Sequence, residues 1–257
     1  MLTPPEIARS LLAAGESKAR LPFGKMLLLA ILAGAYIALA GVGATAAAVT
    51  VESGSLAKLL SACVFPAGLS MVILAGSELF TGNCLMVMAL LERRITPAQL
   101  LHNWLTVYLG NAVGGAAVAA LAVYSHTASL FGDGLARSMA SIAESKAALG
   151  FGDAFLRGVL CNFLVCLAVW MAAASKRAEG KVIALFFPIL LFVLCGYEHC
   201  IANLYYLPAG AFAAAEYGME TTLTLAGCLK NLAAVTLGNL VGGAALGVGY
   251  RFAYLKE

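Results

Sequence analysis

The stretch LHNWLTVYLGNAVGGAA at residues 101–117 decides the fold, because residues 229–245 repeat it as LKNLAAVTLGNLVGGAA. The two stretches match at a constant offset of 128 positions, through Leu-x-Asn and through Leu-Gly-Asn-x-Val-Gly-Gly-Ala-Ala. A second pair, GSELFTGN at 76–83 and GYEHCIAN at 196–203, shares Gly, Glu and Asn at an offset of 120. Two matched pairs in the same order indicate that the chain is an internal duplication.

Composition identifies the lipid bilayer as the solvent of this chain. Its 257 residues are 62% hydrophobic and only 11% charged, whereas soluble domains carry about 25% charged residues. A helix needs about 20 mostly apolar residues to cross the hydrocarbon core, and Gly-containing runs of Leu and Ala are typical of packed membrane helices. We therefore predict an all-α membrane protein with six transmembrane segments, at 24–50, 59–91, 99–124, 155–175, 181–208 and 222–250.

The duplication and the number of segments together predict an inverted repeat. Each half, about 24–126 and 152–252, holds three segments, so the second half enters the membrane from the opposite side. Transporters built in this way place the substrate path where interrupted helices of the two halves meet near the midplane. The Gly-Gly pairs at 114–115 and 242–243 predict tight contacts between helices. Residues 1–257 are expected to form a single transmembrane channel domain.

Residues 1–23 are predicted to form an amphipathic helix on the membrane surface. Thr3 and Glu6 have the spacing of a capping box, and Pro4 stands at the first helical position. Ile7, Leu11 and Leu12 would share an apolar face of this helix. A disordered tail is the alternative interpretation.

The distribution of basic residues predicts the orientation. The N-terminus, the second and fourth loops and the C-terminus hold most of them, namely those at 9, 18, 20, 25, 93, 94, 176, 177, 181, 251 and 256. With six segments these four regions lie on one side of the membrane. The positive-inside rule then predicts that both termini are cytoplasmic.

Polar islands interrupt the second and fifth segments. The second breaks at Gly76-Ser77-Glu78 and the fifth at Gly196-Tyr197-Glu198-His199. Ionisable residues at such depth are costly and usually face a cavity or a partner, and non-helical backbone is tolerated there only where protein or water satisfies it. Because Glu78 and Glu198 occupy matching repeat positions, we interpret both as structural carboxylates that hold the broken helix ends.

His199 breaks the symmetry of the repeat, because its counterpart in the first half is Leu79. A satisfied core histidine is the alternative, but a position inside a matched helix break favours a place on the pathway. Imidazole titrates near neutral pH and can offer a proton or a hydrogen bond to an anion. Thr81 and Asn203 could offer further donors.

Three motifs resemble the formate/nitrite transporter family, and the likeness covers nearly the whole chain. They are Gly-Ser-Glu-Leu-Phe-Thr-Gly-Asn at 76–83, Arg-Gly-x-Leu-Cys-Asn-Phe-Leu-Val-Cys-Leu-Ala-Val-Trp at 157–170 and Gly-Tyr-Glu-His-x-Ile-Ala-Asn at 196–203. The resemblance implies an aquaporin-like protomer of six helices, a homopentamer and one pore in each subunit.

The resemblance also implies site residues. Thr81 and His199 match the central selectivity region of the family, and Asn162 and Asn203 match its pore-side asparagines. Lys146 stands in a polar loop where the family carries a vestibule lysine, although a solvated loop lysine is the alternative. The positions that match apolar constrictions are Phe65, Leu69, Leu79, Phe80 and Phe192. Cys200 departs from the family, which more often has Ser there, and this bears on the transfer of substrate preference.

The predicted function is a channel for small monovalent weak-acid anions in the cell inner membrane. A bare anion is costly to desolvate between two apolar constrictions, whereas a neutral acid crosses far more easily. Lys146 would recruit the anion and His199 would pass it, with protonation. Formate is favoured, with nitrite and hydrosulfide close behind. We expect no cofactor, no metal and no nucleic-acid partner.

Three rival interpretations remain at this point. An aquaglyceroporin-like channel for neutral solutes should carry Asn-Pro-Ala in each half, and the sequence contains no such tripeptide. A membrane-embedded enzyme could use Glu78, Glu198 and His199 as metal ligands or acid/base groups, but no His-Glu-x-x-His motif accompanies them. A purely structural bundle would gain nothing from interrupting two helices at the same repeat position.

Overall fold

A computed structural model describes residues 1–255, and all regular secondary structure in that range is helical. Lys256, one of the basic residues used to predict orientation, lies outside the described residues. The longer helices are α1 Pro4–Ala19, α2 Phe23–Ala48, α3 Gly54–Val64, α4 Pro66–Ala75, α7 Pro97–Tyr124, α8 Gly134–Ala148, α9 Phe151–Ala173, α10 Ala178–Leu194, α11 Cys200–Glu216 and α12 Leu225–Tyr254. The short ones are α5 Phe80–Asn83, η1 Cys84–Met86, α6 Val87–Leu91 and η2 Thr127–Ser129.

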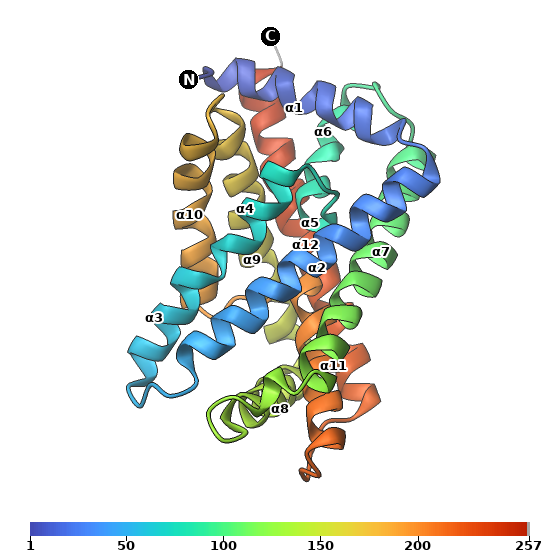
Figure 1. Cartoon of the computed structure of the whole chain (residues 1–257). Coiled ribbons are helices and arrows are strands. Elements are labelled where there is room, and N and C mark those ends of the chain that lie inside the picture. The colour runs from blue at the N-terminus through green and yellow to red at the C-terminus, as the bar shows by residue number, and fades with distance from the viewer. Residues whose placement is uncertain (256–257) are drawn as a thin grey trace.

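The N-terminal segment is a helix, as predicted. The backbone N–H and hydroxyl of Thr3 donate to the carboxylate of Glu6 at 2.7 and 2.8 Å, which closes the start of α1. Ile7 and Ala8 are buried against Met88 and Trp170. Helix α1 therefore lies across one end of the molecule, beside the last turns of α12 (Figure 1).

Five helical stretches of the described chain are long and apolar enough to cross a membrane: Phe23–Ala48, Gly54–Ala75, Pro97–Tyr124, Phe151–Ala173 and Leu225–Tyr254. The remaining crossing is made by α10 and α11, 17 residues each, placed end to end. The predicted end of this segment at 208 is wrong, because α11 continues through Pro208 to Glu216.

The two halves run in opposite directions. Helix α2 starts at the end that carries α1, whereas α9 starts at the end that carries α8 (Figure 1). Each half packs its first helix against its last through the repeated glycines. Gly114 faces the backbone of Ile31, and Gly242 faces the backbone of Val159 at the matching place. The prediction of tight Gly-Gly helix contacts is therefore confirmed.

Both predicted interruptions are present. Helix α4 ends at Gly76, with φ 78°, and α10 is followed by Gly196, with φ 69°. These left-handed backbone angles suit glycine because a Cβ would be strained there. Leu79 and His199 are extended and precede α5 and α11. Two helical runs, Phe80–Leu91 and α11, thus begin in the middle of the molecule and run toward opposite ends (Figure 1).

The loop predicted around Lys146 is instead helix α8, so the loop placement is wrong. Its apolar residues Leu135, Met139 and Ala143 recur every fourth position and are buried. Met139 and Ala143 lie against Gly210 of α11. This packing stabilises a short helix that is too polar to read as a membrane span, and it puts Lys146 in the last helical turn.

Candidate functional site

A buried asparagine holds the first break. Asn111 accepts a hydrogen bond from the backbone N–H of Phe80 at 3.0 Å. Its amide nitrogen donates to the carbonyls of Ala30 at 2.7 Å and Glu78 at 2.9 Å. Backbone groups at this depth have no water to bond, so a side chain must satisfy them. Asn111 performs that task from α7.

The second break is held by the repeat counterpart of Asn111. Asn239 accepts from the backbone N–H of Cys200 at 2.9 Å. Its amide nitrogen donates to the carbonyls of Gly158 at 2.8 Å and Glu198 at 2.9 Å. The two halves thus use the same three contacts at equivalent positions. The asparagine of Leu-Gly-Asn in the repeated stretch is the residue responsible.

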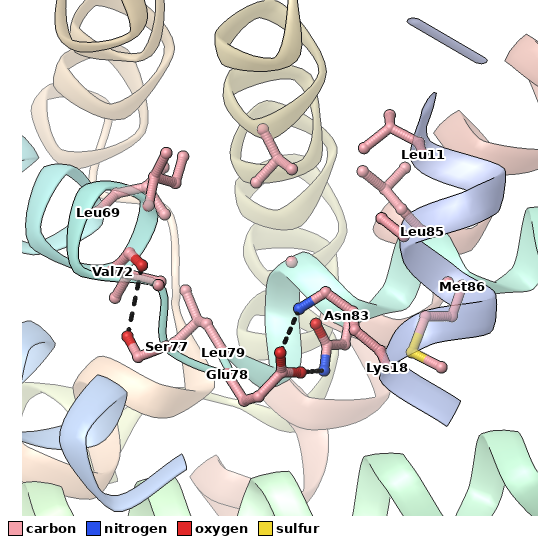
Figure 2. Close-up of a pocket in the computed structure, with 16 residues that line it drawn as sticks. Leu11, Lys18, Leu69, Val72, Ser77, Glu78, Leu79, Asn83, Leu85 and Met86 are labelled. Atoms are coloured by element: carbon pink, nitrogen blue, oxygen red, sulfur yellow. Dashed lines mark hydrogen bonds and ion pairs between the residues drawn. The ribbon is translucent and has the colours of Figure 1, made fainter. Parts of the chain in front are cut away.

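Glu78 is the centre of a buried polar cluster at the first break. Its carboxylate accepts from the ammonium of Lys18 at 2.7 Å and from the amide of Asn83 at 2.7 Å. Asn83 also donates to Asn103 at 2.9 Å. Lys18 comes from α1, so the N-terminal helix supplies the positive charge that compensates this carboxylate (Figure 2).

Glu198 has the matching cluster at the second break. Lys146 donates to both carboxylate oxygens, at 2.9 and 3.1 Å. Asn203 donates to Glu198 at 2.7 Å and to Asn231 at 2.7 Å. Helix α8 therefore supplies the positive charge that compensates the buried carboxylate in the second half, as α1 does in the first. Lys146 is not a solvated loop residue, since only 15% of its side chain is exposed.

Thr81 and His199 meet between the two breaks. The hydroxyl oxygen of Thr81 lies 2.9 Å from Nε2 of His199. The backbone N–H of Ala202 donates to Nδ1 of His199 at 3.0 Å, so Nδ1 carries a lone pair and Nε2 carries the proton of a neutral imidazole. The Nε2–H then donates to Thr81, which leaves the hydroxyl hydrogen of Thr81 free to bond another acceptor.

Apolar side chains lie on both sides of this pair. The ring of Phe192 stacks on His199 with centroids 5.8 Å apart and meets Phe65 edge-on at 5.6 Å. Leu69 and Leu79 face the opposite recess. Phe80 lines neither recess, because its ring packs edge-on against Tyr108 and Trp104. Four of the five predicted constriction residues thus border the approach to the pair.

Two recesses lead toward the pair from opposite ends. The recess at the α1 end has a volume of about 310 Å³, and Lys18, Glu78 and Leu79 are among its lining residues (Figure 2). The recess at the α8 end is larger, about 950 Å³, and is lined by Lys146, Phe192 and His199 among others. Buried apolar residues separate them.

The two predicted pore-side asparagines are buried and bonded to protein. Asn162 donates to the carbonyl of Asn239 at 2.7 Å and to that of Thr81 at 3.3 Å. The thiol of Cys166 donates to the same Thr81 carbonyl at 3.3 Å. Asn162 thus fixes the backbone that carries Thr81, while the side-chain oxygen of Asn203 has no hydrogen-bond partner among the described residues.

Sequence reasoning missed several members of the site. Lys18 carries no local signal, because nothing in the sequence links it to a carboxylate sixty positions away. The asparagines did carry a signal: all seven in the chain are buried, and six of them stand at matching places in the long repeat or its shorter companion. Those six are the pairs Asn83 and Asn203, Asn103 and Asn231, and Asn111 and Asn239.

The chain matches the family model described as formate/nitrite transporter over residues 5–253. It belongs to the formate/nitrite transporter family. The family resemblance drawn from the three motifs is therefore confirmed.

Relatives in this family cover the chain almost completely. A probable formate transporter of Methanothermobacter thermautotrophicus is 38% identical over 99% of this chain and 98% of its own length. The formate channel FocA of Escherichia coli (strain K12) is 34% identical over 100% of this chain and 96% of its own length.

Solved structures agree with the fold. A structure titled FNT family ion channel has a TM-score of 0.86 at 32% identity, and covers 96% of this chain and 98% of its own. A structure titled pentameric formate channel with formate bound has a TM-score of 0.80 at 33% identity, and covers 91% of this chain and 98% of its own.

Membership in this family sets aside two of the rival interpretations. The protein is a multi-pass membrane transport protein and not an enzyme, because its relatives are channels and transporters. The carboxylates that an enzyme would need are engaged in ion pairs with Lys18 and Lys146. Neutral-solute channels of the aquaglyceroporin type share the inverted three-helix plan but not these motifs.

Proposed function

We propose that this protein is a channel for small monovalent weak-acid anions, with formate as the preferred substrate and nitrite and hydrosulfide close to it. The names of the relatives support formate, since several are formate channels or transporters. The chemistry of the site supports the wider class. A passage with one imidazole and one free hydroxyl between apolar walls suits a small solute that exchanges between charged and neutral forms.

The hydrogen-bonded pair of Thr81 and His199 is the observation that carries this proposal. It lies between Phe65 and Phe192 on one side and Leu69 and Leu79 on the other. Bare anions cross such walls at a high desolvation cost, whereas their conjugate acids do not. Dewetted apolar constrictions also exclude hydrated ions. A solute that can be neutral at the walls and hydrogen-bonded between them is therefore favoured.

The hydrogen-bond directions give each residue of the pair a role. The Nε2–H of His199 holds Thr81 as an acceptor, so the hydroxyl hydrogen of Thr81 points to the solute. An anion that accepts this hydrogen bond is stabilised by two donors in series, because the Nε2–H of His199 polarises the hydroxyl of Thr81. The two helical runs that begin at Phe80 and Cys200 add the positive ends of their dipoles on either side. Together these hydrogen-bond donors and helix dipoles stabilise an anion between the two breaks, although neither Thr81 nor the neutral His199 carries a net charge.

The proposal extends to assembly and membrane. The pentameric structure to which the chain is similar supports a homopentamer with one pathway in each subunit. Apolar side chains that are exposed on the outer faces of α7, α9 and α12 suit contact with lipid and with neighbouring subunits. The basic residues around α1 support a cytoplasmic α1 end in the inner membrane. Lys146, which the sequence predicted to recruit the anion, lies at the opposite, outward mouth, where it is paired with Glu198.

Uptake into proteoliposomes tests the function. Purified protein should carry formate, nitrite and hydrosulfide faster than protein-free vesicles, and faster as the pH falls toward the range in which more of each acid is neutral. Chloride, the anion of a strong acid, should pass poorly. The His199→Ala variant should lose selectivity or flux. Equal chloride and formate fluxes in the wild-type protein would contradict the proposal.

A further inference from the structure

Charge is unevenly distributed at the α8 end of the molecule. Seven acidic and five basic residues of the described chain belong to this end, which makes it acidic as a whole. The acidic residues are Glu52, Asp133, Glu144, Asp153, Glu198, Glu216 and Glu220. The recess at this end is nevertheless lined by four of the five basic residues and by one of the seven acidic ones. The four basic residues are Lys58, Arg137, Lys146 and Arg157.

The positive charges in this recess are not equally available. Lys146 is compensated by Glu198, with which it forms two hydrogen bonds. Arg137 is exposed and donates to the carbonyl of Gly132 at 2.6 Å. Lys58 and Arg157 have no ion-pair or side-chain hydrogen-bond partner within residues 1–255, and both are exposed. The uncompensated charge nearest the pathway therefore belongs to Lys58 and Arg157.

These two cations lie together beside the entrance. Arg157 lies within electrostatic range of Lys58, as do Lys146 and Glu198. The backbone carbonyl of Arg157 accepts the N–H of Glu198 at 3.3 Å, which places Arg157 directly at the second helix break. Phe65 and Phe192 line the same recess. An anion held by the two cations would thus stand before the apolar wall that leads to His199.

The first half has no equivalent of this charge pair. The carbonyl that accepts the N–H of Glu78 belongs to Leu29, which is therefore the counterpart of Arg157 at the same offset of 128. The recess at the α1 end is lined by one basic residue, Lys18, and by one acidic residue, Glu78, and these two form an ion pair. Both halves thus keep a carboxylate cluster, but among the described residues uncompensated cations line only the recess at the α8 end.

We propose that Lys58 and Arg157 form an anion-capture site at the α8 mouth, and that this site lowers the anion concentration at which entry from that side is half-maximal. The inference rests on the proposed function and names two residues that set its apparent affinity. Positive charge in a recess raises the local concentration of anions, because the low-dielectric walls focus its field. Lys146 then acts chiefly as the partner of Glu198.

Initial rates of formate uptake by proteoliposomes test this site. The variants are Lys58→Gln, Arg157→Gln and their combination, with Lys230→Gln as the matched control. Lys230 is an exposed basic residue at the same end that does not line the recess. Rates are measured over a range of external formate at low and at high ionic strength, with a cleavable C-terminal tag to report which mouth faces outward.

At an ionic strength of about 0.01 M, where the screening length is about 30 Å, the double variant should need about three to ten times more formate for half-maximal uptake through the α8 mouth. Its maximal rate should stay near that of wild type, and its dependence on salt should be weaker. Lys230→Gln should behave as wild type. A double variant with wild-type half-saturation and salt dependence overturns the inference while the channel function stands. Wild-type protein that carries no formate overturns the proposed function itself.

Discussion

Replacement of Asn239 by Ala should destabilise the protein strongly and without any change in net charge. In the wild-type structure Asn239 is fully buried and satisfies the N–H of Cys200 and the carbonyls of Glu198 and Gly158. Gly158 lies within α9 and keeps its helical hydrogen bond, so the main loss falls on the groups of Cys200 and Glu198. Each buried group left without a partner costs about 1–3 kcal/mol. We therefore expect a loss of about 2–6 kcal/mol, a large share of the roughly 5–15 kcal/mol that stabilises a typical protein.

The free energy of unfolding of detergent-solubilised protein is the quantity to measure, by denaturant or thermal unfolding followed with size-exclusion chromatography. Asn111→Ala should show a loss of similar size, because Asn111 makes the same three contacts in the other half. Ser55→Ala, an exposed substitution in α3, should change stability by less than about 0.5 kcal/mol. The reasoning is refuted if Asn239→Ala unfolds like Ser55→Ala, or if Asn111→Ala is harmless while Asn239→Ala is not.

Three further predictions concern packing, the apolar wall and a loop. Gly242→Ala should lower stability by about 1–3 kcal/mol, because a Cβ there would collide with the backbone of Val159, whereas Gly249→Ala, which meets nothing within 4 Å, should be neutral in the same unfolding assay. Phe192→Ala should raise chloride flux into proteoliposomes, because it opens the wall beside His199; an unchanged chloride flux would mean that Phe192 is not part of the barrier. Hydrogen bonds from Thr221 and Thr222 hold the pKa of Glu144 below its ordinary value of 4.5. Their stabilising contribution is present above that value and is lost as the pH falls through the lowered pKa. Protection of the Thr222 amide from hydrogen exchange, measured relative to the intrinsic exchange rate at the same pH, should therefore be present at neutral pH, decrease as the pH falls below the lowered pKa, and be absent at all pH values in Glu144→Ala; equal protection in the two proteins would contradict this.

The sequence predicted those parts of the fold that depend on long periodic signals. The offset of 128 between 101–117 and 229–245 revealed the duplication, and the odd number of segments in each half implied inversion. Gly76 and Gly196 marked the breaks because each begins a short polar run inside an apolar segment. Few structures other than an interrupted helix explain such a run. Each of these signals is local or repeats itself, so it can be read without coordinates.

The parts that escaped prediction depend on contacts between distant residues. Helix α8 was missed because it is too polar for a span and is stabilised by packing on α11 rather than by its own composition. The partnership of Lys18 with Glu78 joins α1 to the first break, and no spacing rule connects them. The same holds for Lys146, whose place in the sequence was noted while its ion pair with Glu198 was not expected.

The roles proposed for the site residues depend on the hydroxyl of Thr81 more than on any other single atom. Thr81→Val keeps the shape of the side chain and removes the hydroxyl through which, in this account, His199 is linked to the solute. The formate flux of this variant in proteoliposomes tests the central claim most directly. Hydrogen bonds to charged groups contribute about 1.5–3 kcal/mol, so we predict a flux at least about tenfold below wild type. The flux is measured well below the unfolding temperature of the variant, which is lowered because the buried Nε2–H of His199 loses its acceptor. Wild-type formate flux through Thr81→Val would contradict the claim that the anion passes between Thr81 and His199.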